Sequence, residues 1–77
     1  MQNIDIELDT RGLSCPLPIL KAKKSINDLV AGQVIKVKAT DPGALKDFAA
    51  FCKQTGNILL ESVEQNGEFQ FIIQKAA

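Results

Sequence analysis

The fold is decided by one short stretch, Arg11-Gly12-Leu13-Ser14-Cys15-Pro16-Leu17-Pro18, in which a strand pattern gives way to a helix pattern. Before this stretch, apolar and acidic residues alternate from Ile4 to Asp9, with the period of two that is typical of a strand with one buried face. Gly12 permits a tight turn after the strand. The sequence therefore predicts a strand that ends in a loop carrying Cys15.

The two prolines of the stretch indicate where a helix begins. Proline is tolerated in the first helical turn, where backbone N–H groups have no partner within the helix. Pro16 at the first helical position predicts a helix over residues 16–29, with Cys15 at or just before its cap. Apolar residues at helical spacing continue the pattern: Ile19, Ala22, Ile26 and Leu29. Gly32 is expected to provide the left-handed C-cap.

A second strand and a second helix follow with the same logic. Apolar and lysine residues alternate over residues 34–40, which predicts a strand. Asp41 is expected to be the N-cap of the next helix, with Pro42 at its first position and Gly56 at its end. The core-facing stripe expected on this helix consists of Leu45, Phe48, Ala49 and Cys52.

The remaining residues predict a hairpin. Two strands, over residues 58–64 and 68–75, flank Gln65-Asn66-Gly67. Asn-Gly between apolar runs favours a type I′ turn, which needs positive φ at both central residues. The inward face of the last strand is expected to be Phe69, Phe71 and Ile73.

Together these elements predict one domain over residues 1–77, with the order β-α-β-α-β-β. Two helices can cover one face of a four-stranded mixed sheet, so the expected fold is an α/β two-layer sandwich.

The composition excludes several classes of function. Nine basic residues balance nine acidic ones, so the chain lacks the net positive charge that is typical of nucleic-acid-binding proteins. No apolar run approaches the length of about 20 residues that a membrane span needs, so we expect no membrane insertion. The first residues lack the basic and apolar regions of a secretory signal, and we expect a cytoplasmic protein. The chain has no histidine, which excludes an imidazole base.

The two cysteines, Cys15 and Cys52, are expected to be free thiols with different roles. Two thiols without histidine make a poor metal site, and we expect neither metal nor cofactor. Cys52 shares the apolar stripe of the second helix and reads as a buried structural thiol. The position of Cys15 favours an exposed thiolate, because a helix N-terminus stabilises an anion and Arg11 could add positive charge. The alternative is that Cys15 is packed as a small hydrophobic residue.

The chemistry open to Cys15 is narrow. Cysteine hydrolases need a histidine base, and a thioredoxin-type couple needs a second cysteine where Pro18 stands. A thiolate can still accept a sulfur atom from a donor and release it to another thiol. Lys21, Lys23 and Lys24 read as a solvated face or as a rim for an acidic partner, since they lie on the helix that begins after Cys15.

The residues around Cys15 resemble the signature of the TusA/SirA-type sulfur carriers, which is Arg11-Gly12-Leu13-x-Cys15-Pro16-x-Pro18 here. A second block is also similar: Asp41-Pro42-Gly43-Ala44, Asp47 and Phe51-Cys52-x-x-x-Gly56. The resemblance implies the same two-layer sandwich. It also implies that Cys15 is the sulfur acceptor, that Arg11, Gly12, Pro16 and Pro18 shape its loop, and that Lys21, Lys24 and Asp41 are partner contacts. The chain departs from the family pattern in two places: Asn57 stands where many members have His, and Gln74 and Lys75 stand near the end of the last strand, where an Arg is common.

The resemblance further implies two protein partners, a sulfur donor such as a cysteine desulfurase or a rhodanese, and a downstream sulfur acceptor. Members of the family serve transfer-RNA thiolation, sulfur oxidation, thiosulfate metabolism or cofactor assembly. We expect a monomer that holds a transient Cys15 persulfide, rather than an enzyme that turns over alone. The alternative is a regulatory or interaction module in which Cys15 is not essential.

Overall fold

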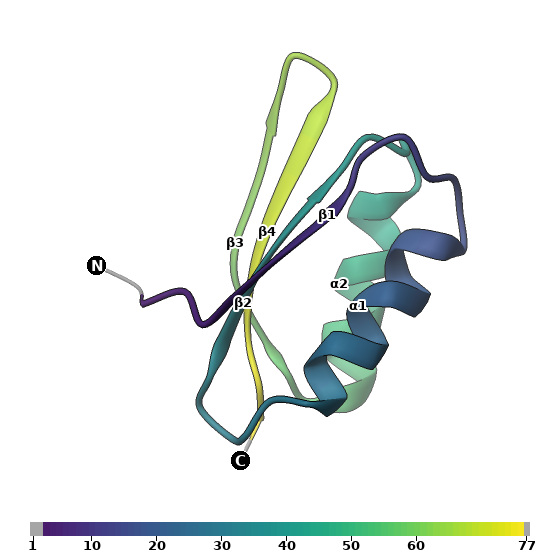
Figure 1. Ribbon diagram of the computed structural model, residues 1–77. Coiled ribbons are helices and arrows are strands. Elements are labelled where there is room, and N and C mark those ends of the chain that lie inside the picture. Colours follow the sequence, from purple (N-terminus) through teal and green to yellow (C-terminus); the bar gives the residue numbers. More distant parts are fainter. Residues whose placement is uncertain (1–2, 77) are drawn as a thin grey trace.

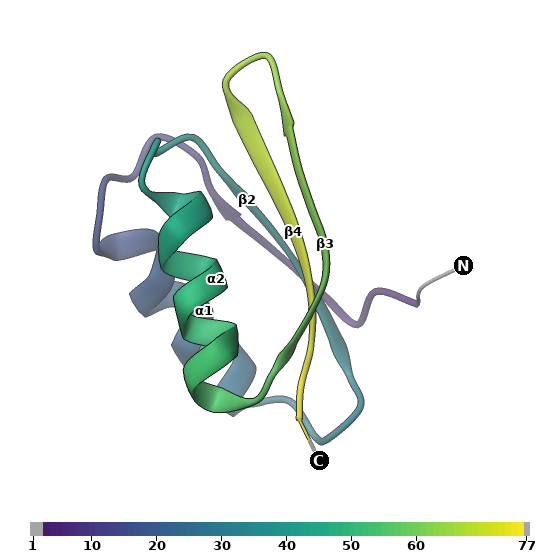
Figure 2. The same ribbon diagram turned by 180° about the vertical axis from the view of Figure 1, so that it is seen from behind.

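The computed structural model describes residues 3–76 and has two layers, a four-stranded sheet and two helices packed on one of its faces (Figures 1 and 2). The elements follow the predicted order: β1 Ile6–Thr10, α1 Leu17–Asn27, β2 Val34–Ala39, α2 Ala44–Thr55, β3 Ile58–Gln65 and β4 Glu68–Gln74. The predicted α/β sandwich with two helices on one face is therefore confirmed.

The sheet is mixed, with the spatial order β1-β2-β4-β3. β1 runs parallel to β2, with Leu8 opposite Val37, whereas β4 is antiparallel to both of its neighbours. A parallel pair requires a crossover connection, and α1 supplies it. The parallel pairing brings the carboxyl ends of β1 and β2 to the same edge of the sheet, and this edge is where the site lies.

The first helix begins almost as predicted and ends earlier. Pro16 is the N-cap rather than the first helical residue, and the Cys15–Pro16 peptide bond is cis. The last helical residue is Asn27, capped by Asp28 in the right-handed region. The prediction that Gly32 caps this helix was wrong. Gly32, with φ 89°, lies in the turn before β2, where its N–H donates to the Lys75 carbonyl at 3.0 Å.

Two predictions for the second helix were wrong: its N-cap and part of its buried stripe. Its N-cap is Gly43, and Asp41 is not the cap: the Asp41 carboxylate accepts the Gly43 N–H at 3.0 Å and closes the turn before the helix. Pro42 accordingly also precedes the helix. The buried stripe consists of Ala44, Phe48, Phe51 and Cys52. Leu45 and Ala49, which were expected in the core, are exposed.

The end of α2 and the turn between β3 and β4 both have the glycine conformations that the sequence predicts. Gly56 ends α2 in the left-handed conformation, with φ 81°, and its N–H donates to the Cys52 carbonyl at 3.0 Å. Asn66 and Gly67 both have positive φ, 54° and 78°, as the type I′ turn of the hairpin requires.

The core lies between the helices and the sheet. Phe48 of α2 stacks on Phe71 of β4 with ring centroids 4.5 Å apart, and both side chains are fully buried. The predicted inward residues Phe69, Phe71 and Ile73 are all buried. Within residues 3–76, neither helix is long and apolar enough to cross a membrane.

Candidate functional site

Cys15 lies in the loop between β1 (Ile6–Thr10) and α1 (Leu17–Asn27). Figure 1 shows this loop at the edge of the sheet where β1 and β2 both end. Its thiol is exposed and free, and the residue stands one position before the helix N-cap. The expected exposure of Cys15 is confirmed, and the alternative of a packed, buried thiol is wrong. The loop before α2 ends at the same edge, which brings a second set of side chains to the thiol.

A shallow groove runs from Cys15 between the two helices. Its volume is about 260 Å³, and its walls are mainly apolar. The lining residues are Cys15, Pro16, Ile19, Leu20, Lys23, Asp47, Ala50, Phe51 and Gln54. Leu20 stands out because 51% of it is exposed, a large fraction for a leucine. The thiol therefore lies at one end of an open apolar surface rather than in an enclosed pocket.

Two carboxylates face the thiol. The Cys15 S–H donates to Asp47 Oδ2 at 3.3 Å, and the possible ligand atoms of Cys15, Asp41 and Asp47 all lie within 4.8 Å of one another. The hydrogen bond to Asp47 raises the pKa of Cys15 above its ordinary value. Desolvation and the negative charges of Asp47 and Asp41 act in the same direction. The two carboxylates therefore oppose the thiolate that the helix terminus was expected to favour.

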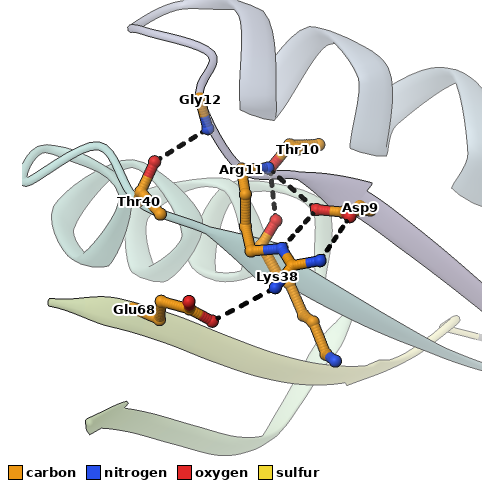
Figure 3. Close-up of polar contacts among 7 residues, drawn as sticks. All are labelled: Asp9, Thr10, Arg11, Gly12, Lys38, Thr40 and Glu68. Atoms are coloured by element: carbon orange, nitrogen blue, oxygen red, sulfur yellow. Dashed lines mark hydrogen bonds and ion pairs between the residues drawn. The ribbon is translucent and has the colours of Figure 1, made fainter. Parts of the chain in front are cut away.

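Arg11 does not supply the positive charge that the sequence suggested. Its guanidinium pairs with Asp9 on β1, with Nη2 2.9 Å from Oδ2 and Nε donating to Oδ1 at 2.9 Å. Its Nη1 lies 3.6 Å from Glu68 on β4 (Figure 3). Arg11 thus links the start of the Cys15 loop to two strands and makes no ion pair with the groups around the thiol.

The loop is also held by hydrogen bonds to the end of β2. The Gly12 N–H donates to Thr40 Oγ1 at 2.9 Å, and the buried Thr10 hydroxyl donates to the Lys38 carbonyl at 2.6 Å (Figure 3). Gly12 has φ 84°, a conformation that favours glycine. Further along, Pro16 lines the groove and Pro18 is buried in the first turn of α1. The hydrogen bond to Thr40 holds Gly12 in place, and the loop-shaping roles expected of Gly12, Pro16 and Pro18 stay predictions.

Of the three lysines on α1, Lys23 lines the groove. Lys21 and Lys24 are exposed and do not line it. Their expected role as partner contacts stays a prediction, as does that of Asp41.

Asp47 contacts the Cys15 thiol, and the sequence did not predict this contact. Asp47 belongs to the second block that resembles the family, but nothing in the sequence around it indicates a contact with Cys15. The topology could have indicated it, because a parallel β1–β2 pair places both following helix starts at one edge of the sheet. An acidic residue in the first turn of α2 is then a neighbour of Cys15 in space, although 32 positions separate them.

Cys52 lies apart from the site. It is 5% exposed, it belongs to the core cluster, and burial raises the pKa of its thiol. The prediction that it is a buried thiol is confirmed.

The atoms of Cys15, Asp41 and Asp47 are also close enough together to be metal ligands. One thiolate and two carboxylates are an unusual set for zinc, which prefers cysteine and histidine in structural sites. Asp41 already accepts the Gly43 N–H through Oδ2. The expectation of no metal stays a prediction.

Comparisons with known proteins agree on one family. The family model described as sulfurtransferase TusA matches residues 6–75. The chain is 59% identical over 76 residues to the sulfur carrier protein TusA of Allochromatium vinosum, covering 99% of this chain and 100% of that one. It is 37% identical to the sulfur carrier protein TusA of Pseudomonas aeruginosa, covering 97% and 95% of the two chains.

A solved structure shares the fold. The crystal structure of a SirA-like protein from Desulfitobacterium hafniense superposes with a TM-score of 0.82 at 27% identity, covering 94% of this chain and 99% of that one. The matched segment contains the Cys15 loop, both helices and the whole sheet. The chain therefore belongs to the TusA sulfurtransferase family.

Proposed function

We propose that this sulfur carrier holds its cargo as a persulfide on Cys15 and relays it from a donor protein to an acceptor protein. The observation that carries this assignment is the position of Cys15: an exposed, free thiol at the end of an open apolar groove, in a loop tied to the sheet. The sulfur carrier proteins of Allochromatium vinosum and Pseudomonas aeruginosa match 99% and 97% of the chain, which supports the relay role.

Each transfer is an exchange between sulfur atoms. In loading, the Cys15 thiolate attacks the outer sulfur of a donor persulfide, the donor's S–S bond breaks, and the donor leaves as a thiolate. In delivery, a thiolate of the acceptor attacks the outer sulfur held on Cys15, and Cys15 returns as a thiolate. One S–S bond forms as another breaks in both steps, so no external oxidant or reductant is needed.

The open shape of the site suits a carrier that two partners must reach in turn. A groove of about 260 Å³ offers a docking surface without enclosing a small substrate. A cysteine desulfurase and a rhodanese are the donor classes we propose. The acceptor belongs to transfer-RNA thiolation, sulfur oxidation, thiosulfate metabolism or cofactor assembly. We place the relay in the cytoplasm, with the carrier as a monomer whose interfaces with both partners are transient.

The test is the intact mass of the reduced protein after loading. Two donor systems are run side by side, a cysteine desulfurase with cysteine and a rhodanese with thiosulfate. We expect the wild type to gain the mass of one or more sulfur atoms in at least one system, and dithiothreitol to remove it. The Cys15→Ser variant should gain nothing.

The matched control is Cys52→Ala, which should load as the wild type does. Alanine is preferred to serine here, because a hydroxyl buried among apolar side chains costs free energy unless it is hydrogen-bonded. Equal loading of Cys15→Ser would show that the wrong cysteine was chosen. If neither donor system loaded the wild type with sulfur, the interaction-module alternative would be favoured and the proposal overturned.

A further inference from the structure

The groups around Cys15 form an unusual setting for a nucleophile. Asp47 faces the thiol from the first turn of α2, and Asp41 faces it from the loop before that helix. Lys23, from α1, lines the same groove. Arg11 has its guanidinium engaged by Asp9 and Glu68. The charges that act on the Cys15 thiol are those of Asp47 and Asp41, and both are negative, although the thiolate that must attack is itself an anion.

The contact with Asp47 is direct. The Cys15 S–H donates to Asp47 Oδ2 at 3.3 Å, and this is the side-chain hydrogen bond that the thiol makes within residues 3–76. Asp47 is half-buried on a helix whose next turn, at Phe48 and Phe51, is anchored in the core. The carboxylate is thus held in place by a rigid element rather than by a loop.

We propose that Asp47 is a positioning residue for Cys15, whose carboxylate holds the unloaded thiol by its S–H hydrogen bond and restrains its reaction between sulfur transfers. This inference rests on the proposed role of Cys15 as the sulfur acceptor. The raised pKa of the thiol is the expected electrostatic result of the same contact.

Loading changes this contact in a defined way. Once Cys15 carries a second sulfur atom, Sγ has no proton to donate, and the hydrogen bond to Asp47 is lost. A persulfide anion places its charge on the outer sulfur, which the carboxylates of Asp47 and Asp41 repel toward solvent. The same residue therefore holds the empty carrier and directs the loaded sulfur outward, where a partner can reach it.

The test is the pH profile of Cys15 alkylation by iodoacetamide, measured on the full chain with the modified residue identified by peptide mass. The Asp47→Asn variant keeps the size of the side chain and removes its charge. We expect the midpoint of its profile to move to lower pH and the rate near pH 7 to rise severalfold. An unchanged profile, or a slower rate near pH 7, would overturn the proposal.

Two matched variants separate the contact from general charge effects. Asp28→Asn removes an exposed carboxylate at the far end of α1 and should leave the profile unchanged. Asp41→Asn removes the second charge, which makes no hydrogen bond to the thiol, and should shift the profile less than Asp47→Asn. A shift from Asp28→Asn as large as that from Asp47→Asn, or a larger one from Asp41→Asn, would also overturn the proposal.

The alkylation assay uses no sulfur donor, so it tests the positioning role of Asp47 independently of the sulfur-acceptor role of Cys15. Circular dichroism and urea unfolding of Asp47→Asn establish that the variant is folded before its profile is compared. A Cys15 that never accepts sulfur overturns the proposed function and leaves the coupling to Asp47 measurable. A Cys15 that loads but titrates independently of Asp47 overturns only the positioning role.

Discussion

Arg11 shows how a residue in a reactive loop can serve structure rather than chemistry. From the sequence, four positions before Cys15, its charge was expected to help the thiolate. In the structure, two nitrogens of the guanidinium contact the Asp9 carboxylate, and a third faces Glu68. A planar guanidinium binds a carboxylate in this bidentate way, which lysine cannot reproduce.

Asp9 reports on this contact through its own titration. The hydrogen bonds from Arg11 lower the pKa of Asp9 from 3.8 to about 2. A carboxyl group with a depressed pKa in the folded state contributes stability above its unfolded pKa and loses it as the pH falls. The contribution of Asp9 is therefore complete above about pH 4 and disappears as the pH falls toward 2.

We predict that Arg11→Ala returns the pKa of Asp9 to about 4, its ordinary value. The measurement is an NMR titration of side-chain carboxyl carbons in the wild type and the variant. Asp5, which precedes β1 and accepts the Val34 N–H, has no contact from Arg11, and its carboxyl resonance serves as the internal reference. A titration of Asp9 that is the same in both proteins would contradict the bidentate contact.

At the scale of elements, the C-terminal end of α2 follows the backbone rules more closely than its buried face follows the predicted spacing. Gly56 ends α2 with φ 81°, where a side chain is strained whatever the space around it. In contrast, the stripe predicted for α2 was right at Phe48 and Cys52 and wrong at Leu45 and Ala49, which are exposed. Apolar residues occur on most sides of this helix, so spacing alone could not choose between Leu45 and Ala44 for the core.

We predict that Gly56→Ala lowers the free energy of unfolding by about 1–2 kcal/mol, the cost of a left-handed conformation for a residue with a Cβ atom. Urea denaturation monitored by circular dichroism measures this. Gly56→Asn is the matched variant and should cost less, because asparagine tolerates this region. Equal effects of the two substitutions would show that side-chain contacts, rather than backbone strain, set the cost.

For the whole molecule, stability depends on the contact between α2 and the sheet. Phe48 and Phe71 stack at 4.5 Å and are both fully buried. Because α2 also carries Asp47, this contact sets the position of the carboxylate relative to Cys15. A domain of 77 residues has a small margin of stability, and the removal of a buried phenylalanine side chain costs about 3–5 kcal/mol.

A milder substitution is therefore the informative one. We predict that Phe48→Leu lowers the free energy of unfolding by about 1–2 kcal/mol, through the lost stacking and the small cavity left behind. Leu45→Ala, on the exposed face of the same helix, should change it by no more than about 0.5 kcal/mol. Urea denaturation compares the two variants. If Leu45→Ala lowered the free energy of unfolding more than Phe48→Leu does, Leu45 would belong to the core, as the sequence predicted.

The sequence by itself determined the order of elements, the hairpin, the glycine-ended helix α2 and the family. These features depend on local chemistry: alternation in strands, proline at a helix start, and positive φ at Asn66, Gly67 and Gly56. The exposure of Cys15 was predictable for the same reason, because its position just before a helix is a local property. The family assignment follows from a motif that is contiguous in the chain.

Only the tertiary structure decided which charges surround Cys15. Arg11, four residues away in sequence, is directed to Asp9 and Glu68, whereas Asp47, 32 positions away, contacts the thiol. Local rules also misplaced the cap of α2, because Asp41 closes a turn before Gly43 instead. The physical reason is that electrostatic neighbours and buried faces are set by how β1, β2 and the helices pack, and no spacing along the chain encodes those distances.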